Sequence, residues 1–124
     1  MKKLNILLVD DEQEFVVTLA ERLELRGYGV SISQDGEAAL QRFIHQEFDL
    51  VILDLMMPGM NGLHVLARIK EIRPQIPVLL LTGHGSTREG TEGMRLGAFD
   101  YLMKPLRIED LIHKIKQAVP LKTA

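Results

Sequence analysis

Charged or hydroxyl-bearing residues follow four of the five most apolar runs of this sequence. The run Ile6–Val9 is followed by two carboxylates, and the run Leu50–Leu53 is followed by one. Each such residue alone is ordinary, because Asp is common after strands and at the starts of helices. Asp11 alone, for instance, is equally typical of a helix cap. The residues in question are Asp10, Asp11, Asp54, Thr82 and Lys104.

These side chains predict a cation site if the fold brings them together. Two carboxylates ~4 Å apart repel by about 4 kcal/mol at an effective dielectric near 20, and one lysine cannot neutralise three of them. A divalent cation can. The chain has no Cys, and an all-oxygen ligand set favours Mg²⁺ or Mn²⁺ over zinc. We therefore expect a Mg²⁺ site, with Mn²⁺ as the alternative ion.

A Mg²⁺ ion held by a few carboxylates usually serves a phosphate group. A bound nucleotide is disfavoured, because the turn after the first apolar run reads DDEQE instead of a glycine-rich sequence with bare amides. The alternative is covalent, since a carboxylate can attack phosphorus and form an acyl phosphate. Asp54 is the candidate nucleophile, with Thr82 to hydrogen-bond one phosphoryl oxygen and Lys104 to pair with another.

The elements that must position these residues alternate along the chain. The apolar runs predict strands that begin roughly 21 to 27 residues apart, which leaves room for one helix and two short loops each time. We expect an α/β fold, a doubly wound (βα)5 flavodoxin-like arrangement whose five-stranded parallel sheet has the order 2-1-3-4-5 and helices on both faces. The first and third strands are then neighbours, where such sheets bind ligands. The predicted strands are Leu4–Val9, Gly29–Ser33, Leu50–Leu53, Pro77–Leu81 and Phe99–Met103.

The segments between the strands have helical periodicity. Asp35 is placed to cap the second helix, and Pro74 prevents the third, Leu63–Ile72, from continuing. The residues predicted to face inward are Phe15, Leu19 and Leu23 in the first helix, Leu40, Phe43 and Ile44 in the second, and Ile108, Leu111, Ile112, Ile115 and Val119 in the fifth.

The fourth helix, Ser86–Leu96, is different. It has few large apolar residues, and Gly90 and Gly93 lie in its interior. Each glycine costs a helix about 1 kcal/mol relative to alanine. We expect this helix to be the most weakly held element.

The composition excludes several classes of protein. The 124 residues, 46% hydrophobic and 26% charged, are typical of one soluble domain. We expect that domain to span residues 1–124, with a core at about 4–119 and a tail or the start of a linker at 120–124. A net charge of -2 disfavours direct nucleic-acid binding. No apolar stretch is long enough for a signal peptide or a membrane span, and the lack of Cys suits a reducing compartment. These features predict a cytoplasmic protein without direct contact to nucleic acid or membrane.

Four ordered motifs resemble those of bacterial response-regulator receiver domains. They are LLVDDE at residues 7–12, LDLMMPGMNG at 53–62, LLLTGHG at 79–85 and AFDYLMKPL at 98–106. The resemblance runs from about Asn5 to Val119. Its wording is closest to receivers of nitrogen-regulation-type transcription activators.

This resemblance implies roles for individual residues. Asp54 would be the phosphoacceptor, and Asp10 and Asp11 would hold Mg²⁺ together with Asp54 and the backbone carbonyl of Met56. Thr82 would be the switch hydroxyl and Lys104 the cation that pairs with the phosphoryl group.

The resemblance also implies structural roles. Tyr101 would be the aromatic residue that swings inward on activation, although an ordinary half-buried strand tyrosine is the alternative. Pro58 and Gly62 would shape the loop after Asp54, and the Lys104–Pro105 peptide would be cis.

The function implied is that of a phosphorylation-activated signalling switch. Asp54 would receive its phosphoryl group from a sensor histidine kinase or a phosphotransfer protein. The domain would assist its own phosphorylation and dephosphorylation without being a turnover enzyme. Its conformational change would be read by an output domain or partner, or by a second copy in a phosphorylation-dependent homodimer, at the face of the fourth helix, fifth strand and fifth helix. The output implied is transcription.

Two other functions stay open at this point. An Asp-nucleophile phosphatase typically has a second carboxylate two residues after the nucleophile. That position is Met56 after Asp54 and Glu12 after Asp10, without the rest of such a motif. The other alternative is a receiver-like module that binds partners without being phosphorylated.

Overall fold

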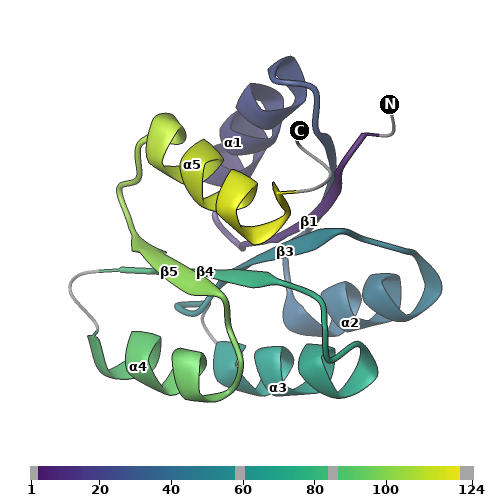
Figure 1. The fold of residues 1–124 in the computed structure, drawn as a ribbon, viewed down its shortest axis with the longest axis vertical. Coiled ribbons are helices and arrows are strands. Elements are labelled where there is room, and N and C mark those ends of the chain that lie inside the picture. Colours follow the sequence, from purple (N-terminus) through teal and green to yellow (C-terminus); the bar gives the residue numbers. More distant parts are fainter. Residues whose placement is uncertain (1–2, 58–60, 84–86, 121–124) are drawn as a thin grey trace.

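A five-stranded parallel sheet in the order β2-β1-β3-β4-β5 forms the centre of the molecule (Figure 1). The structure is a computed structural model, and it describes residues 3–57, 61–83 and 87–120. The predicted fold and strand order are confirmed. The strands are β1 (Asn5–Val9), β2 (Gly29–Ser33), β3 (Leu50–Asp54), β4 (Val78–Thr82) and β5 (Asp100–Met103). The helices are α1 (Gln13–Leu25), α2 (Gly36–His45), α3 (Gly62–Ile72), α4 (Thr87–Arg95) and α5 (Ile108–Ala118).

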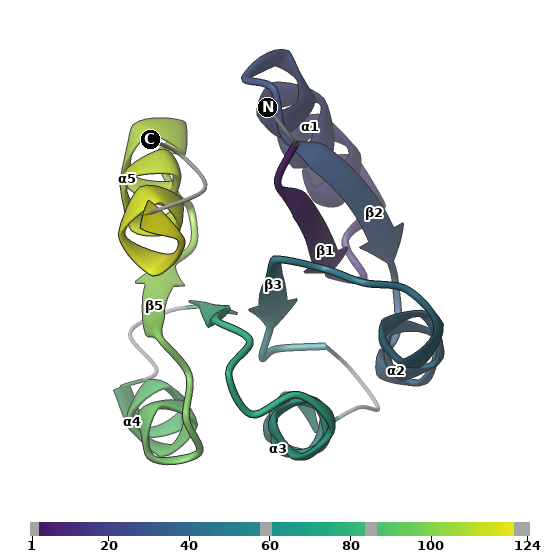
Figure 2. The ribbon, with the colours of Figure 1, turned by 45° about the vertical axis from the view of Figure 1, so that its right-hand side comes forward.

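Helices cover both faces of the sheet, α1 and α5 on one and α2, α3 and α4 on the other (Figures 1 and 2). Successive strand residues point to opposite faces, so Leu8 joins the core under α1 and α5 while Leu7 joins the core on the other side. β3 and β4 are buried along their whole length. This explains why the central strands have continuous apolar runs. None of the described helices combines the length and the apolarity needed to cross a bilayer.

β3 and β4 extend one residue beyond the predicted strands and include Asp54 and Thr82. Asp54 is in register with Leu81, and Thr82 with Met103. The backbone ladder continues past both, because the Leu55 amide donates to the Leu81 carbonyl and the Lys104 amide donates to the Thr82 carbonyl. The polar side chains are therefore held by the sheet itself.

The helix faces agree with the sequence in part. Asp35 caps α2, its carboxylate accepting from the Ala38 amide at 2.7 Å, as predicted. The prediction for Ile44 is wrong, since this side chain is 45% exposed while Phe43 is fully buried. The buried face of α2 consists of Gly36, Ala39 and Phe43, and Ile44 points about 100° away from Phe43, at the edge of that face. α1 buries Val16, which the spacing of Phe15, Leu19 and Leu23 did not indicate.

Two glycines of α4 lie where the helix meets the sheet. A Cβ on Gly93 would come within 2.2 Å of Leu80 Cδ1, and one on Gly90 would lie 3.4 Å from the Tyr101 ring. Gly93 therefore permits a close approach between α4 and β4. Glycines that make this helix intrinsically weak also determine how it packs. The predicted start of the helix, Ser86, lies outside the described residues.

Gly62 begins α3 directly beneath the loop that follows Asp54. A Cβ there would lie 2.9 Å from Leu55 Cα and 3.2 Å from the Asp54 carbonyl oxygen. These are backbone atoms that cannot rotate away. The predicted role of Gly62 in shaping this loop has a steric basis, whereas Pro58 lies outside the described residues.

We predict that Gly62→Ala lowers the free energy of unfolding by about 1–3 kcal/mol through overpacking. Gly90→Ala is the matched control, because its Cβ would make ordinary contact with the Tyr101 ring. That control should be neutral or slightly stabilising. Urea melts of both variants measure the difference. Equal stability of the Gly62→Ala variant and the parent would show that the loop after Asp54 adjusts freely.

Candidate functional site

Strand ends at one edge of the sheet bring the candidate residues together. Asp10 follows β1, Asp54 ends β3 and Thr82 ends β4, and their exposed fractions are 0%, 1% and 0%. Buried carboxylates of this kind are costly unless they are paired. The sequence prediction that these groups converge on one edge is correct for Asp10, Asp54 and Lys104.

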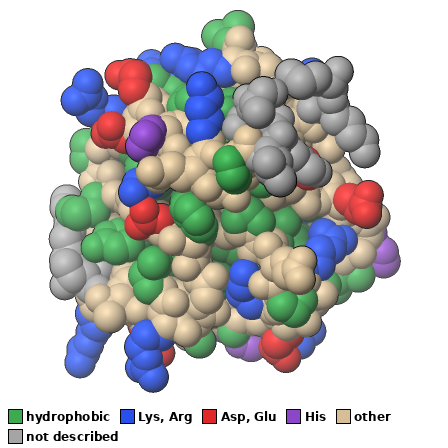
Figure 3. Space-filling model, in the orientation of Figure 1, with side chains coloured by type: hydrophobic (Ala, Val, Ile, Leu, Met, Phe, Trp, Pro, Cys, Tyr) green, Lys and Arg blue, Asp and Glu red, His purple; other side chains and the backbone are tan. Residues whose placement is uncertain are grey.

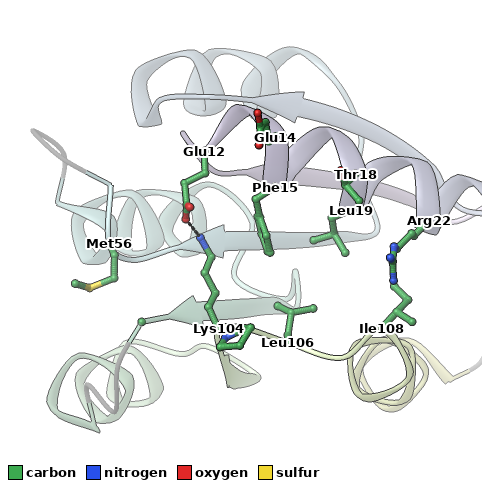
Figure 4. A pocket seen from close by; sticks show the side chains of 12 residues that line it. Glu12, Glu14, Phe15, Thr18, Leu19, Arg22, Met56, Lys104, Leu106 and Ile108 are labelled. Carbon is green, nitrogen blue, oxygen red and sulfur yellow. Dashed lines mark hydrogen bonds and ion pairs between the residues drawn. The ribbon is translucent and has the colours of Figure 1, made fainter.

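The Lys104 ammonium lies among three carboxylates. Its Nζ is 2.5 Å from Glu12 Oε1, 2.8 Å from Asp10 Oδ2 and 3.4 Å from Asp54 Oδ2. Figure 4 shows Lys104 reaching from the end of β5 to Glu12 at the start of α1. The lysine thus supplies part of the positive charge that this cluster requires.

Asp10 and Asp54 use their two oxygens in the same way. Oδ1 of Asp10 accepts from the Glu12 amide at 2.9 Å, and Oδ1 of Asp54 accepts from the Met56 amide at 2.9 Å. Each carboxylate therefore bonds the backbone two residues ahead, which orients the side chain. Oδ2 of each residue is left to face Lys104.

Burial and pairing shift two pKa values in this cluster. Burial raises the pKa of the Asp10 carboxyl above its usual range, and the hydrogen bond from Lys104 offsets this only in part. For Lys104, burial lowers the pKa, but hydrogen bonds to Asp10 and Glu12 outweigh burial and raise it above its usual value. The ammonium therefore stays charged at neutral pH, and the cluster retains an excess of negative charge.

Three carboxylates are close enough to hold one cation. One oxygen each of Asp10, Glu12 and Asp54 lies within 4.8 Å of the others. All three donors are hard oxygens, which suits Mg²⁺ or Mn²⁺. Their summed charge exceeds that of one lysine, so the residues present fit a divalent ion.

Glu12 was missed by the sequence analysis, although it is the third acidic residue of the DDE run at residues 10–12. Asp11 is exposed and lies outside the group of three. The helix-cap alternative for Asp11 is wrong, because the residue that caps α1 is Glu12 and its side chain makes no cap hydrogen bond. The role of Asp11 as a metal ligand stays a prediction.

The other predicted residues lie around this cluster. Thr82 Oγ1 is buried, and no atom of the described residues hydrogen-bonds it. The Met56 side chain is 52% exposed at the site. Tyr101 is half-buried beside Gly90, and its movement on activation stays a prediction. The Lys104–Pro105 peptide is cis, as predicted.

A pocket of about 770 Å³ adjoins the acidic cluster. It lies between α1 and the connection from β5 to α5 (Figure 4). Phe15 and Leu19 line it from α1, and Leu106 and Ile108 line it from the other side. The pocket reaches the cluster at Glu12 and Lys104, whereas the buried Asp10 and Asp54 do not line it.

Comparisons with known proteins agree with this geometry. A family profile described as "Response regulator receiver domain" matches residues 6–116. The transcriptional regulatory protein YkoG of Bacillus subtilis, itself uncharacterized, is 40% identical over 119 residues, which are 96% of this chain and 52% of YkoG. The chain thus spans about half the length of such curated relatives.

Solved structures show the same fold. A response regulator receiver domain protein from Clostridium thermocellum superposes with a TM-score of 0.90 at 34% identity, over 97% of each chain. NtrX from Brucella abortus superposes with a TM-score of 0.91 at 30% identity, over 98% of this chain and 28% of NtrX. The architecture and the four sequence motifs therefore lead to the same group of proteins.

Proposed function

This chain belongs to the response regulator receiver domain family, and from that membership we propose that Asp54 accepts a phosphoryl group from a sensor histidine kinase or a phosphotransfer protein. Receiver domains are phosphorylation-controlled switches of two-component systems. The position of Asp54 is the single observation that carries the assignment. Its Oδ2 faces the ammonium of Lys104, while its Oδ1 is held by the Met56 amide.

The proposed reaction is a displacement at phosphorus. Oδ2 of Asp54 forms a bond to the phosphorus atom, the bond between phosphorus and the donor atom breaks, and the donor keeps that electron pair. Lys104 lies 3.4 Å from Oδ2 and needs little movement to pair with a phosphoryl oxygen. Mg²⁺ would supply the remaining positive charge on the phosphoryl oxygens. Mass measurement of the parent and of Asp54→Asn after exposure to acetyl phosphate tests the proposal.

Asp10, Glu12 and Asp54 would hold the Mg²⁺ ion, together with Asp11 and the Met56 carbonyl that the family resemblance implies. The grouping of three carboxylates supports a cation at this edge of the sheet. Lys104 contacts one oxygen of each of the same three carboxylates, so the ion and the ammonium would share this group of carboxylates. The domain would thereby assist its own phosphorylation and dephosphorylation without turning over a substrate.

We predict that Asp11→Asn weakens Mg²⁺ binding by about tenfold or more while leaving the metal-free stability unchanged or slightly raised. Asp11 is exposed and next to two other carboxylates, so removing its charge relieves repulsion. Glu14→Gln, at the second residue of α1, is the control and should change neither the Mg²⁺ affinity nor the metal-free stability. Calorimetric Mg²⁺ titration and urea melts in chelator give both readouts. Parent-like affinity would show that Asp11 is not a ligand of the ion.

The proposed output surface is the face of α4, β5 and α5. Large hydrophobic side chains are exposed there, and Figure 3 shows hydrophobic side chains gathered between α4 and α5. An output domain or partner, or a second copy after phosphorylation, would bind this face. Transcriptional regulation is the proposed output, because relatives such as YkoG carry that description. The exposed hydrophobic residues on α4, on β5 and between them are Met94, Leu96, Phe99 and Met103.

A further inference from the structure

The Phe15 ring forms the apolar side of the Lys104 site. Lys104 Nζ lies 4.3 Å from the centroid of this ring. Phe15 is half-buried, and it packs against the core between the sheet and the helices α1 and α5. Figure 4 shows the ring pointing from α1 toward the end of the Lys104 side chain.

A cation over an aromatic face is attracted by the electrons of the ring. The ring also excludes water from one side of the ammonium, which strengthens the attraction of the carboxylates on the other side. Lysine has a flexible four-carbon stem with many rotamers. A fixed ring therefore narrows the positions that the ammonium can take.

The carboxylate partners differ in how firmly they can hold Lys104. Glu12 makes the shortest contact, 2.5 Å, but its side chain is 61% exposed. An exposed ion pair is easily exchanged for water. Asp54 makes the longest contact, 3.4 Å. The buried Asp10 carboxylate holds the Lys104 ammonium at 2.8 Å, and the contact with the Phe15 ring adds a second restraint that the exposed Glu12 cannot supply.

We propose that Phe15 is a positioning residue for phosphoryl transfer, which holds the Lys104 ammonium beside Oδ2 of Asp54 through its aromatic face. This role rests on the proposed function, because it acts on the lysine that pairs with the phosphoryl group. The contact of Phe15 at this site is with the Lys104 ammonium. Its effect on the reaction passes entirely through Lys104.

Phe15→Leu keeps an apolar side chain and removes the aromatic face, whereas Phe15→Tyr keeps both. Thr18→Ala is the matched control, since Thr18 lines the same pocket from the same helix. Two quantities are measured: the ring-current shift of the Lys104 ε-methylene protons by NMR, and the rate of phosphorylation by acetyl phosphate with Mg²⁺. Phe15→Met replaces Phe15→Leu if the leucine variant does not fold.

We expect the upfield shift of the Lys104 protons in the parent, in Phe15→Tyr and in Thr18→Ala, and its loss in Phe15→Leu. Phosphorylation of Phe15→Leu should be about three- to tenfold slower, the range that one cation–π contact supplies, with the tyrosine variant close to the parent. A parent-like rate in Phe15→Leu overturns the proposal, and so does a tyrosine variant as slow as the leucine variant. If the parent takes up no phosphoryl group, the proposed function itself is wrong. The ring-current shift is measured on unmodified protein, so it still reports whether Phe15 contacts Lys104 in that case.

Discussion

We expect Asp54→Asn to take up no phosphoryl group from acetyl phosphate and Mg²⁺, and the parent to gain one. This complete loss is expected because an amide oxygen is a far weaker nucleophile than a carboxylate oxygen. The substitution keeps size and shape, so its amide oxygen can still accept from the Met56 amide, which Oδ1 of Asp54 does at 2.9 Å. It also removes one of three mutually repelling carboxylates, so the variant should fold. Intact-mass analysis counts the phosphoryl groups.

Asp35→Asn is the matched control for this experiment. It removes a carboxylate from the chain, yet Asn caps a helix about as well as Asp does, so α2 keeps its start. This control should be labelled as fully as the parent. Labelling of Asp54→Asn to the extent of the parent would mean that another residue is the acceptor.

The sequence predicts the location of the site better than its inner arrangement. Parallel strands end at one edge of the sheet, so the position of Asp54 in the chain suffices to place it next to Asp10. Which acidic residue of residues 10–12 turns inward is decided by the local backbone. Asp10 accepts from the Glu12 amide, and the resulting turn brings the Glu12 carboxylate to Lys104. The spacing of residues in the sequence does not predict that turn.

The Phe15 contact could not be predicted for a related reason. In the sequence Phe15 belongs to an apolar stripe with Leu19 and Leu23, and a stripe at helical spacing indicates a core. The structure shows that Phe15 is half-buried, with its ring against an ammonium that comes from residue 104. Contacts between residues so far apart in the chain depend on packing, which periodicity does not describe.

For α4 the sequence predicted a weak helix, and the structure gives a second reason for this weakness. The sequence prediction depended on two glycines in the interior of the helix, and the structure shows that the described part of this helix also packs few side chains against the core. Among residues 88–95, the only buried positions are Gly90 and Gly93, so this part of the helix buries no apolar side chain. α5, in contrast, buries Ile108, Leu111 and Ile115. Local stability follows the apolar area that an element buries.

We expect phosphorylation to change amide protection in α4 more than in any other described helix. Before phosphorylation, the helical amides of α4 should exchange fastest, since little buried area opposes local opening. A bistable element needs two arrangements within a few kcal/mol of each other, and an element that buries little apolar area, such as α4, is the natural candidate. Hydrogen exchange followed by mass spectrometry, with and without acetyl phosphate, measures the change at residues 87–95 against α1 and α2.

We expect Thr82 to connect the phosphoryl group to this helix. Its Oγ1 is buried, with no hydrogen-bond partner among the described residues, and an unpaired buried hydroxyl is costly. A phosphoryl oxygen on Asp54 would give it a partner. The Thr82 side chain and the segment that leads to α4 would then move toward Asp54 and open space for the Tyr101 ring, which now lies beside Gly90.

Thr82→Ala should therefore still be phosphorylated but lose most of the change in α4. Ser33→Ala is the matched control, because Ser33 Oγ is also buried without a partner among the described residues but lies at the end of the edge strand β2. This control should respond like the parent. If the protection of α4 rises or falls equally in the parent and in Thr82→Ala, the hydroxyl does not transmit the signal. If phosphorylation of the parent leaves all described helices equally protected, the switch lies elsewhere, even with Asp54 as the acceptor. A change confined to α4 and dependent on Thr82 would mean that the weakest helix of the fold moves because a buried hydroxyl gains its first partner.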